Sequence, residues 1–173
     1  MKTTILITGT SRGIGKALAL HFLSQGVTVI GSSRKTHSEL AHYPNFFSLK
    51  LDLSNSKSRA TAIQQVQDNF ESIDILINNA GIGPDIDHCT PSEVDLENTL
   101  SVNLTGTVLF TEELIGHMTL KGKIINISSK MGSINSCKKS DSTAYRISKA
   151  ALNMYTQILS IQVKKREELV QKI

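Results

Sequence analysis

Short apolar runs rich in β-branched residues alternate with longer amphipathic stretches from one end of the chain to the other. Such alternation is typical of βα units that stack into a parallel sheet. The predicted strands cover residues 4–8, 28–31, 46–51, 73–78 and 123–127, and the predicted helices cover 13–24, 56–70, 96–118 and 142–165. Residues 169–173 are a candidate start of a sixth strand. The pattern therefore predicts an α/β fold with a doubly wound parallel sheet.

Length and composition fit one folded domain. The 173 residues contain 39% hydrophobic and 20% charged side chains, which supplies a buried core and excludes a disordered chain. The net charge of +4 is not gathered into blocks, so it argues against a nucleic-acid partner. No apolar run approaches the roughly 18 residues of a membrane span, and the run before Thr8 is too brief for a signal peptide. We expect a single domain over residues 1–173, in the cytoplasm and without a membrane partner.

The residues that commonly bind metals show no suitable spacing. Cys89 and Cys137 lie far apart and match no CxxC or zinc pattern, so we expect reduced thiols of a cytosolic protein. The five histidines show no spacing of the HxxxH kind. We therefore expect no metal site.

A glycine-rich turn, Thr8-Gly9-Thr10-Ser11-Arg12-Gly13-Ile14-Gly15, follows the first predicted strand and opens the first predicted helix. Glycine permits a tight turn and lets the backbone approach a pyrophosphate, and the N–H groups at a helix N-terminus attract that anion. The spacing is GxxxGxG instead of the commoner GxGxxG, and a glycine cluster alone is often only a turn. Its position after the first strand favours dinucleotide binding.

The end of the second predicted strand indicates which dinucleotide is bound. An acidic residue there would bond the ribose 2′-OH and repel a 2′-phosphate, but the chain has Gly31-Ser32-Ser33-Arg34-Lys35. The guanidinium of Arg34 suits a phosphate, and Arg12 in the glycine-rich turn is placed to reach the same group. These features favour NADP(H) over NAD(H). The alternative is that Arg34 and Lys35 are ordinary solvated loop cations.

Polar residues also follow the later predicted strands. Asn78-Asn79-Ala80-Gly81 ends the fourth strand, where open α/β sheets bind ligands, although these residues also suit a plain turn. Ser128-Ser129 follows the fifth strand, and Tyr145 and Lys149 stand four residues apart at the start of the last helix. That spacing puts both side chains on one helix face, close enough for the ammonium to stabilise a phenolate.

Together these motifs resemble the short-chain dehydrogenase/reductase family. The resemblance covers residues 4–155 and includes TGTSRGIG, an Asp after the third strand (Asp52), NNAG, the Asn of Ser101-Val102-Asn103-Leu104, Ser-Ser and YRISK. The stretch from Tyr145 to Met154, with Met131-Gly132-Ser133-Ile134 before it, is most similar to the C-factor-like and sniffer-like carbonyl reductases of that family. The resemblance implies a Rossmann domain that transfers hydride between a nicotinamide and a carbonyl or alcohol carbon.

The resemblance also implies roles for individual residues. Tyr145 would be the proton donor or acceptor, Lys149 would stabilise its phenolate and hold the nicotinamide ribose, Ser129 would orient the substrate carbonyl, and Asn103 would support a water next to Lys149. The other cofactor contacts would come from Gly9, Ser11, Arg12, Gly13, Ile14 and Gly15 near the pyrophosphate, Arg34 near the 2′-phosphate, Asp52 near the adenine, and Asn79 with Gly81 near the ribose.

The chain departs from the family pattern in two places. The distance from Ser129 to Tyr145 is longer than in many members, because extra residues fall in 135–142; they alter the pocket mouth or form a tolerated surface insertion. Family members also continue with a sixth strand, a substrate loop and a seventh strand, and we expect these elements to be missing here. A truncated reductase, a short form closed by a partner and a piece of a longer protein are the three explanations.

Two functions from different classes follow. The first is an NADP(H)-dependent carbonyl reductase or alcohol dehydrogenase that uses Asn103, Ser129, Tyr145 and Lys149. The alternative is a non-catalytic nucleotide-binding or interaction protein that retains the fold. A homodimer through the long helices is expected from the resemblance, and a monomer is the alternative, because one helix face must cover the sheet in any case. The sequence does not identify the substrate.

Overall fold

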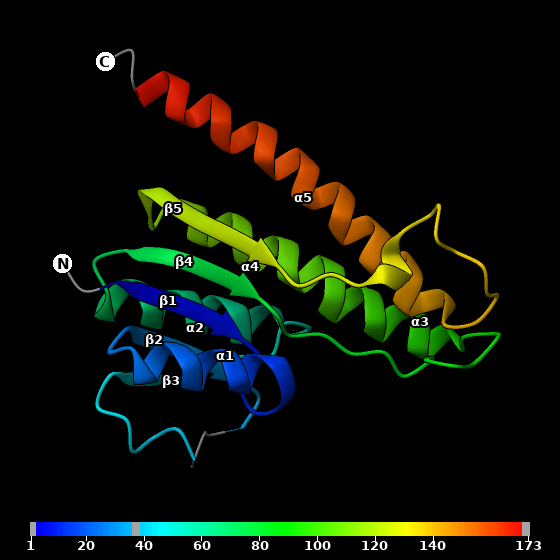
Figure 1. Ribbon diagram of the computed structural model, residues 1–173, viewed down its shortest axis with the longest axis horizontal. Coiled ribbons are helices and arrows are strands. Elements are labelled where there is room, and N and C mark those ends of the chain that lie inside the picture. The colour runs from blue at the N-terminus through cyan, green and yellow to red at the C-terminus, as the bar shows by residue number, and fades with distance from the viewer. Residues whose placement is uncertain (1–2, 36–38, 171–173) are drawn as a thin grey trace. The chain divides into compact units, whose positions relative to one another are not determined.

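Five parallel strands pair in the order β3-β2-β1-β4-β5 and form one sheet. The coordinates are a computed structural model that describes residues 3–35 and 39–170. The strands are β1 Thr4–Thr8, β2 Thr28–Ser33, β3 Phe46–Lys50, β4 Ile73–Asn78 and β5 Met118–Asn126 (Figure 1). This order, with a crossover from β1 to β4, confirms the predicted doubly wound Rossmann sheet.

The backbone divides into two compact units that alternate along the chain. The first unit contains Met1–Gly81 and Thr105–Ile127, and the second contains Ile82–Leu104 and Ser128–Ile173. The whole sheet belongs to the first unit, together with helices α1 (Gly13–Ser24), α2 (Ser56–Asn69) and α4 (Thr107–Ile115). The second unit contains α3 (Glu93–Leu100), a short 3-10 turn, η2 (Lys130–Gly132), and the long helix α5 (Thr143–Val170). The expectation of one domain over the whole chain stays a prediction.

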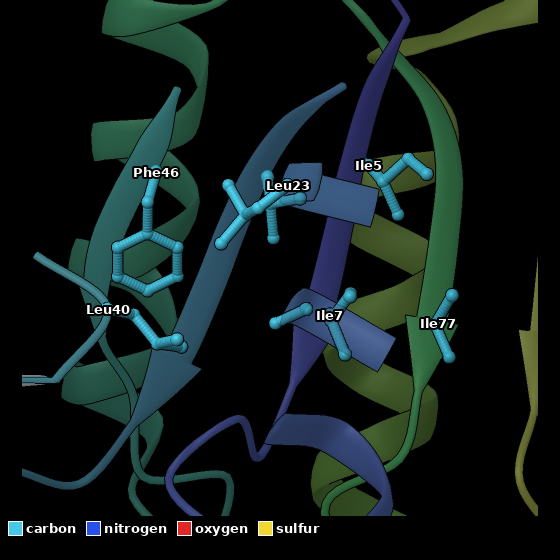
Figure 2. Packing of buried hydrophobic residues seen from close by; sticks show 8 residues of the cluster. Ile5, Ile7, Leu23, Leu40, Phe46 and Ile77 are labelled. Atoms are coloured by element: carbon cyan, nitrogen blue, oxygen red, sulfur yellow. The ribbon is translucent and has the colours of Figure 1, made fainter. Parts of the chain in front are cut away.

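One hydrophobic cluster of the first unit lies between α1 and the sheet. Helix α1 covers one face of the sheet, and α2 and α4 cover the other (Figure 1). The cluster shown in Figure 2 contains Ile5, Ile7, Ala19, Leu23, Val29, Leu40, Phe46 and Ile77. Leu6 of β1 is also fully buried, on the opposite face from its neighbours, because adjacent strand residues point to opposite sides. Burial on both faces explains why the central strands have nearly continuous apolar sequences.

Some predicted boundaries were wrong. Strand β2 extends to Ser33 instead of residue 31, β3 ends at Lys50, and β5 begins at Met118 instead of residue 123. Helix α5 continues to Val170, where a sixth strand was a candidate, because neither Gly nor Pro interrupts residues 143–170. The remaining part of that candidate, residues 171–173, lies outside the described residues.

The predicted helix over residues 96–118 is three elements instead of one. Helix α3 ends at Leu100, a π-helical segment, η1, covers Ser101–Gly106, and α4 begins at Thr107. At Gly106 the backbone lies so close to Leu53 that an added Cβ would be 2.2 Å from the Leu53 carbonyl oxygen. A π-helical turn changes which side chains point inward and is frequent at functional sites, and Asn103 lies in this one.

Candidate functional site

The glycine-rich turn of the first unit has the conformation that a phosphate-binding loop requires. Gly9 and Gly13 have φ angles of 76° and 58°, in the left-handed region that side chains disfavour. An added Cβ at Gly15 would lie 2.3 Å from the Gly9 carbonyl oxygen. In the part of the chain that the structure describes, no side chain caps the start of α1. The N–H groups at this helix end are therefore available to an anion.

The turn is fixed in place by the strands on both sides of β1. The N–H groups of Gly9 and Thr10 donate to the Ser32 carbonyl on β2 at 3.0 and 2.9 Å. After β4, the Asn79 side chain donates to the carbonyls of Thr8 and Gly9 at 2.9 and 3.1 Å. The side-chain amide donor of Asn79 is thus engaged with the backbone of the turn, a structural role that the sequence analysis did not identify.

The predicted cofactor residues of the first unit lie in the first turn of α1 and on the loops that follow the strands. Ser11, Arg12, Gly13, Ile14, Arg34 and Gly81 are exposed, and Gly15 is buried. Glu39, the first acidic residue after β2, forms an ion pair with Lys16 of α1, and this hydrogen bond lowers the pKa of the Glu39 carboxyl. Asp52 accepts hydrogen bonds from Ser54 N and Oγ at 3.0 and 2.6 Å. The left-handed glycines, the uncapped helix start and the exposed arginines fit a dinucleotide, and the individual contacts stay predictions.

In the second unit, Asn103 connects three segments of the chain. Its Oδ1 accepts from the Ile82 N–H at 2.8 Å, and its Nδ2 donates to the Ile82 carbonyl at 2.7 Å and to Ser148 Oγ at 3.1 Å. Ser148 Oγ in turn donates to the Tyr145 carbonyl at 2.8 Å. Asn103 is only 1% exposed, so these bonds replace the water that a polar side chain needs. The network joins the predicted residues Asn103 and Tyr145 through Ser148, a link that the sequence analysis missed.

Tyr145 and Lys149 lie on one face of α5, as their spacing predicted. Lys149 Nζ is 5.7 Å from the centre of the Tyr145 ring. Lys149 is only 5% exposed, and burial lowers the pKa of its ammonium group. The pair therefore combines a phenol with a poorly solvated amine, whose charge acts more strongly on a neighbour than it would in water.

The predicted residue Ser129 lies directly before the turn η2, which packs against α5. Ser129 Oγ accepts from the Met131 N–H at 3.1 Å, so its own hydroxyl proton can still be donated. An added Cβ at Gly132 would lie 2.8 Å from Lys149 Cβ, which shows how closely the turn approaches that lysine. Asn153 of α5 accepts from Ser128 Oγ at 2.6 Å and donates to the Gly132 carbonyl at 3.2 Å. It therefore fixes the chain on both sides of Ser129.

A groove on α5 is lined by residues near Ser129 but not by the Tyr145–Lys149 pair. An open groove of about 410 Å³ is lined by Gly132, Ser133, Ile134, Asn135, Ala150, Asn153, Met154 and Gln157, and by neither Tyr145 nor Lys149. Within the described residues, no three His, Cys, Asp or Glu side chains gather as metal ligands. Nor does any described helix have the length and apolar character needed to cross a membrane.

Replacing Lys149 by Met is expected to change how stability depends on pH. Because burial lowers the pKa of Lys149 from its ordinary 10.5, the unfolded chain keeps this proton at pH values where the folded chain has lost it. The free energy of unfolding of the wild type should therefore rise with pH in the window below about 10.5, and Lys149→Met should lack this rise. Urea denaturation over that window measures it, with the exposed Lys130→Met as control. If the free energy of unfolding depended on pH in the same way in the wild type and in Lys149→Met, burial of the Lys149 ammonium would be contradicted.

The comparison with protein families agrees with this geometry. The sequence model of the short chain dehydrogenase family matches residues 3–173. The chain is 35% identical over 175 residues to the 3-oxoacyl-[acyl-carrier-protein] reductase FabG of Aquifex aeolicus, an alignment that covers 95% of this chain and 69% of that protein. An uncharacterized oxidoreductase of Schizosaccharomyces pombe, C162.03, is 35% identical over 75% of this chain and 46% of its own length. The chain belongs to the short-chain dehydrogenase/reductase family of oxidoreductases.

Solved structures of the family share the fold. Sniffer of Caenorhabditis elegans, a proposed carbonyl reductase, aligns with a TM-score of 0.85 at 27% identity, over 96% of this chain and 82% of that one. The Brucella melitensis 3-oxoacyl-[acyl-carrier protein] reductase in complex with NAD aligns with 0.83 at 26% identity, over 96% and 70%. A Burkholderia multivorans protein with bound NADP aligns with 0.84 at 27% identity, over 95% and 75%. Relatives with this fold thus bind either dinucleotide.

Proposed function

We propose that this chain is an NADP(H)-dependent oxidoreductase that interconverts a carbonyl compound and an alcohol. The observation that carries the proposal is the arrangement of the second unit, where the buried Lys149 lies 5.7 Å from the Tyr145 ring on one helix face. A protein that only binds nucleotides has no use for an acid or base, whereas carbonyl reduction requires a proton at the substrate oxygen.

The chain's own residues account for the proton. When bound, the reduced nicotinamide supplies hydride to the carbonyl carbon. The Tyr145 hydroxyl gives its proton to the carbonyl oxygen and becomes a phenolate, which the Lys149 ammonium stabilises until solvent returns a proton. Ser129 donates its hydroxyl proton as a hydrogen bond to the same oxygen, and Asn103 holds Ile82 and Ser148 so that Tyr145 keeps its position. In the oxidation direction each transfer is reversed.

The preference for NADP(H) is proposed from the end of β2. Arg34 follows that strand and is exposed, Arg12 is exposed in the glycine-rich turn, and no acidic residue ends the strand. The backbone hydrogen bonds from Gly9 and Thr10 to Ser32 connect this turn to β2, the strand that Arg34 follows. A guanidinium matches the 2′-phosphate that distinguishes NADP from NAD.

Replacing Arg34 by Ala is expected to raise the Kd for NADPH by about tenfold or more and to change the Kd for NADH by less than about twofold. A hydrogen bond between charged groups contributes about 1.5–3 kcal/mol, and only NADPH carries the 2′-phosphate. Fluorescence titration with both nucleotides measures it, with the neighbouring Lys35→Ala as control. An equal rise of the Kd for both nucleotides would show that Arg34 does not bind the 2′-phosphate.

The experiment that tests the proposed function is titration of the purified chain with NADPH and NADH, followed by rate measurements on a panel of aldehydes and ketones. Turnover with NADPH supports the proposal. Tight binding of the nucleotide without turnover favours a nucleotide-binding or interaction protein instead. Absence of nucleotide binding overturns the proposed oxidoreductase function.

Two further proposals concern the setting of the protein. The two cysteines, Cys89 and Cys137, are free and exposed, and we propose that they are reduced thiols of a cytoplasmic protein. Following the resemblance to dimeric family members, we propose that two copies associate. Sedimentation of the purified chain distinguishes a dimer from a monomer.

A further inference from the structure

Asp85 is a buried carboxylate at the beginning of helix α5. It is 0% exposed, its Oδ2 accepts from the Ala144 N–H at 2.7 Å, and its Oδ1 accepts from the Tyr145 N–H at 3.2 Å. The first N–H groups of a helix have no partner inside the helix, and a negative charge is favoured at that end. One of the two amides that Asp85 holds is that of Tyr145, the proposed proton donor.

The rest of the segment around Asp85 also contacts Tyr145 or its supports. An added Cβ at Gly83 would lie 2.9 Å from Tyr145 Cδ2, so this glycine leaves room for the phenol ring. Ile82 is bonded through its N–H and its carbonyl to Asn103, which reaches the Tyr145 carbonyl through Ser148. The segment 82–85 therefore constrains Tyr145 at its ring, its carbonyl and its N–H.

Ser142, the residue directly before α5, does not cap this helix with its side chain. The hydroxyl of Ser142 accepts from the Asp87 N–H at 3.0 Å and donates to Asp141 Oδ1 at 3.0 Å. Asp87 and Ser142 have φ angles of 68° and 57°, and Ser142 N–H donates to the His88 carbonyl at 2.8 Å. The strained residues Asp87 and Ser142 thus connect the loop after Asp85 with the loop before α5. The Ser142 hydroxyl is engaged in this connection, so the carboxylate of Asp85 accepts from the N–H groups of the first turn of α5.

We propose that Asp85 is a positioning residue for Tyr145. It acts through the two backbone amides of the first turn of α5, which fix the point where the phenol leaves the helix. The inference rests on the proposed role of Tyr145 in proton transfer. A displacement of about 1 Å in a group that transfers a proton lowers a rate by about a hundredfold, so a carboxylate that fixes this turn affects turnover without touching the substrate.

The test compares Asp85→Asn with Asp87→Asn. Asp85→Asn keeps the shape of the side chain but replaces one acceptor oxygen by an NH2 group that faces a backbone N–H. Asp87→Asn is the control, because Asp87 has an exposed side chain and a left-handed φ that Asn adopts readily. We expect kcat to fall about ten- to hundredfold in Asp85→Asn, with KM and the Kd for NADPH within about twofold, and no such loss in Asp87→Asn. A lower melting temperature with unchanged kcat per folded molecule would reduce Asp85 to an ordinary helix cap and overturn the proposal.

A second measurement separates this proposal from the proposed function. If the wild-type chain binds NADPH but shows no turnover, the proposed function fails, and amide hydrogen exchange decides the role of Asp85. Faster exchange at Ala144 and Tyr145 in Asp85→Asn than in Asp87→Asn supports the positioning; equal exchange overturns it. Asp85→Ser, which is smaller and keeps one hydroxyl acceptor, serves the same comparisons if Asp85→Asn does not fold.

Discussion

Replacing Tyr145 by Phe is expected to lower kcat for carbonyl reduction by at least about a hundredfold and to leave the Kd for NADPH within about twofold. Phe keeps the ring that packs against Gly83 and removes only the hydroxyl, so the fold and the neighbouring contacts are retained. General acid–base catalysis by a positioned side chain contributes about 10²- to 10⁴-fold to a rate. The measurement is the initial rate of NADPH oxidation with the best substrate of the carbonyl panel.

Tyr43→Phe is the matched control for this variant. Tyr43 lies in the first unit, where its ring contacts the tilted ring of His42 with a centroid distance of 4.2 Å. The same chemical change at this position should leave kcat unaltered. If Tyr145→Phe retained the wild-type rate while its nucleotide affinity was also unchanged, proton donation by Tyr145 would be excluded.

Replacing Gly15 by Ala is expected to weaken the binding of NADPH and NADH alike, by about ten- to a hundredfold. The added Cβ would lie 2.3 Å from the Gly9 carbonyl oxygen and 2.4 Å from Asn79 Nδ2. Neither contact is the flexible end of a long side chain, so the glycine-rich turn must shift. Overpacking of this kind costs about 1–3 kcal/mol, which corresponds to that range of affinity.

The control for Gly15→Ala is Gly116→Ala at the end of α4. Gly116 has an ordinary helical conformation, and an added Cβ would meet no described atom within 4 Å. The affinity for both nucleotides should therefore be unchanged in Gly116→Ala. Wild-type affinity in Gly15→Ala would show that the turn does not approach the dinucleotide. A loss confined to NADPH would instead assign Gly15 to the 2′-phosphate.

The fold was predictable because its central elements have strong local patterns. Strands β1 and β4 and helix α1 have the predicted boundaries, since each is an apolar or amphipathic run that ends at Asn or Ser or directly before Gly. The break after Leu100 was not predictable from periodicity. Leucines four apart continue through the π-helical segment, and the approach of Gly106 to Leu53 is a contact between distant parts of the chain.

The candidate site was predictable only where neighbours in sequence are neighbours in space. The spacing of Tyr145 and Lys149 placed both on one face of a helix, and the structure agrees. The partners of Tyr145 were missed, because Asp85 and the Asn103–Ser148 pair act across long sequence separations. The available signal for Asp85 was an acidic residue shortly after Asn78-Asn79-Ala80-Gly81, and this signal does not say which helix the carboxylate caps.

The second unit is assembled from two stretches, Ile82–Leu104 and Ser128–Ile173, with part of the first unit between them in the chain. The bonds from Asn103 to Ser148 and from Asp85 to Ala144 close loops of 45 and 59 residues. The entropy lost in closing such loops must be compensated before these contacts stabilise the unit, so they form late relative to local helix turns. During synthesis on a ribosome, helix formation in α5 therefore does not complete the surroundings of Tyr145, which are complete only when both stretches have met.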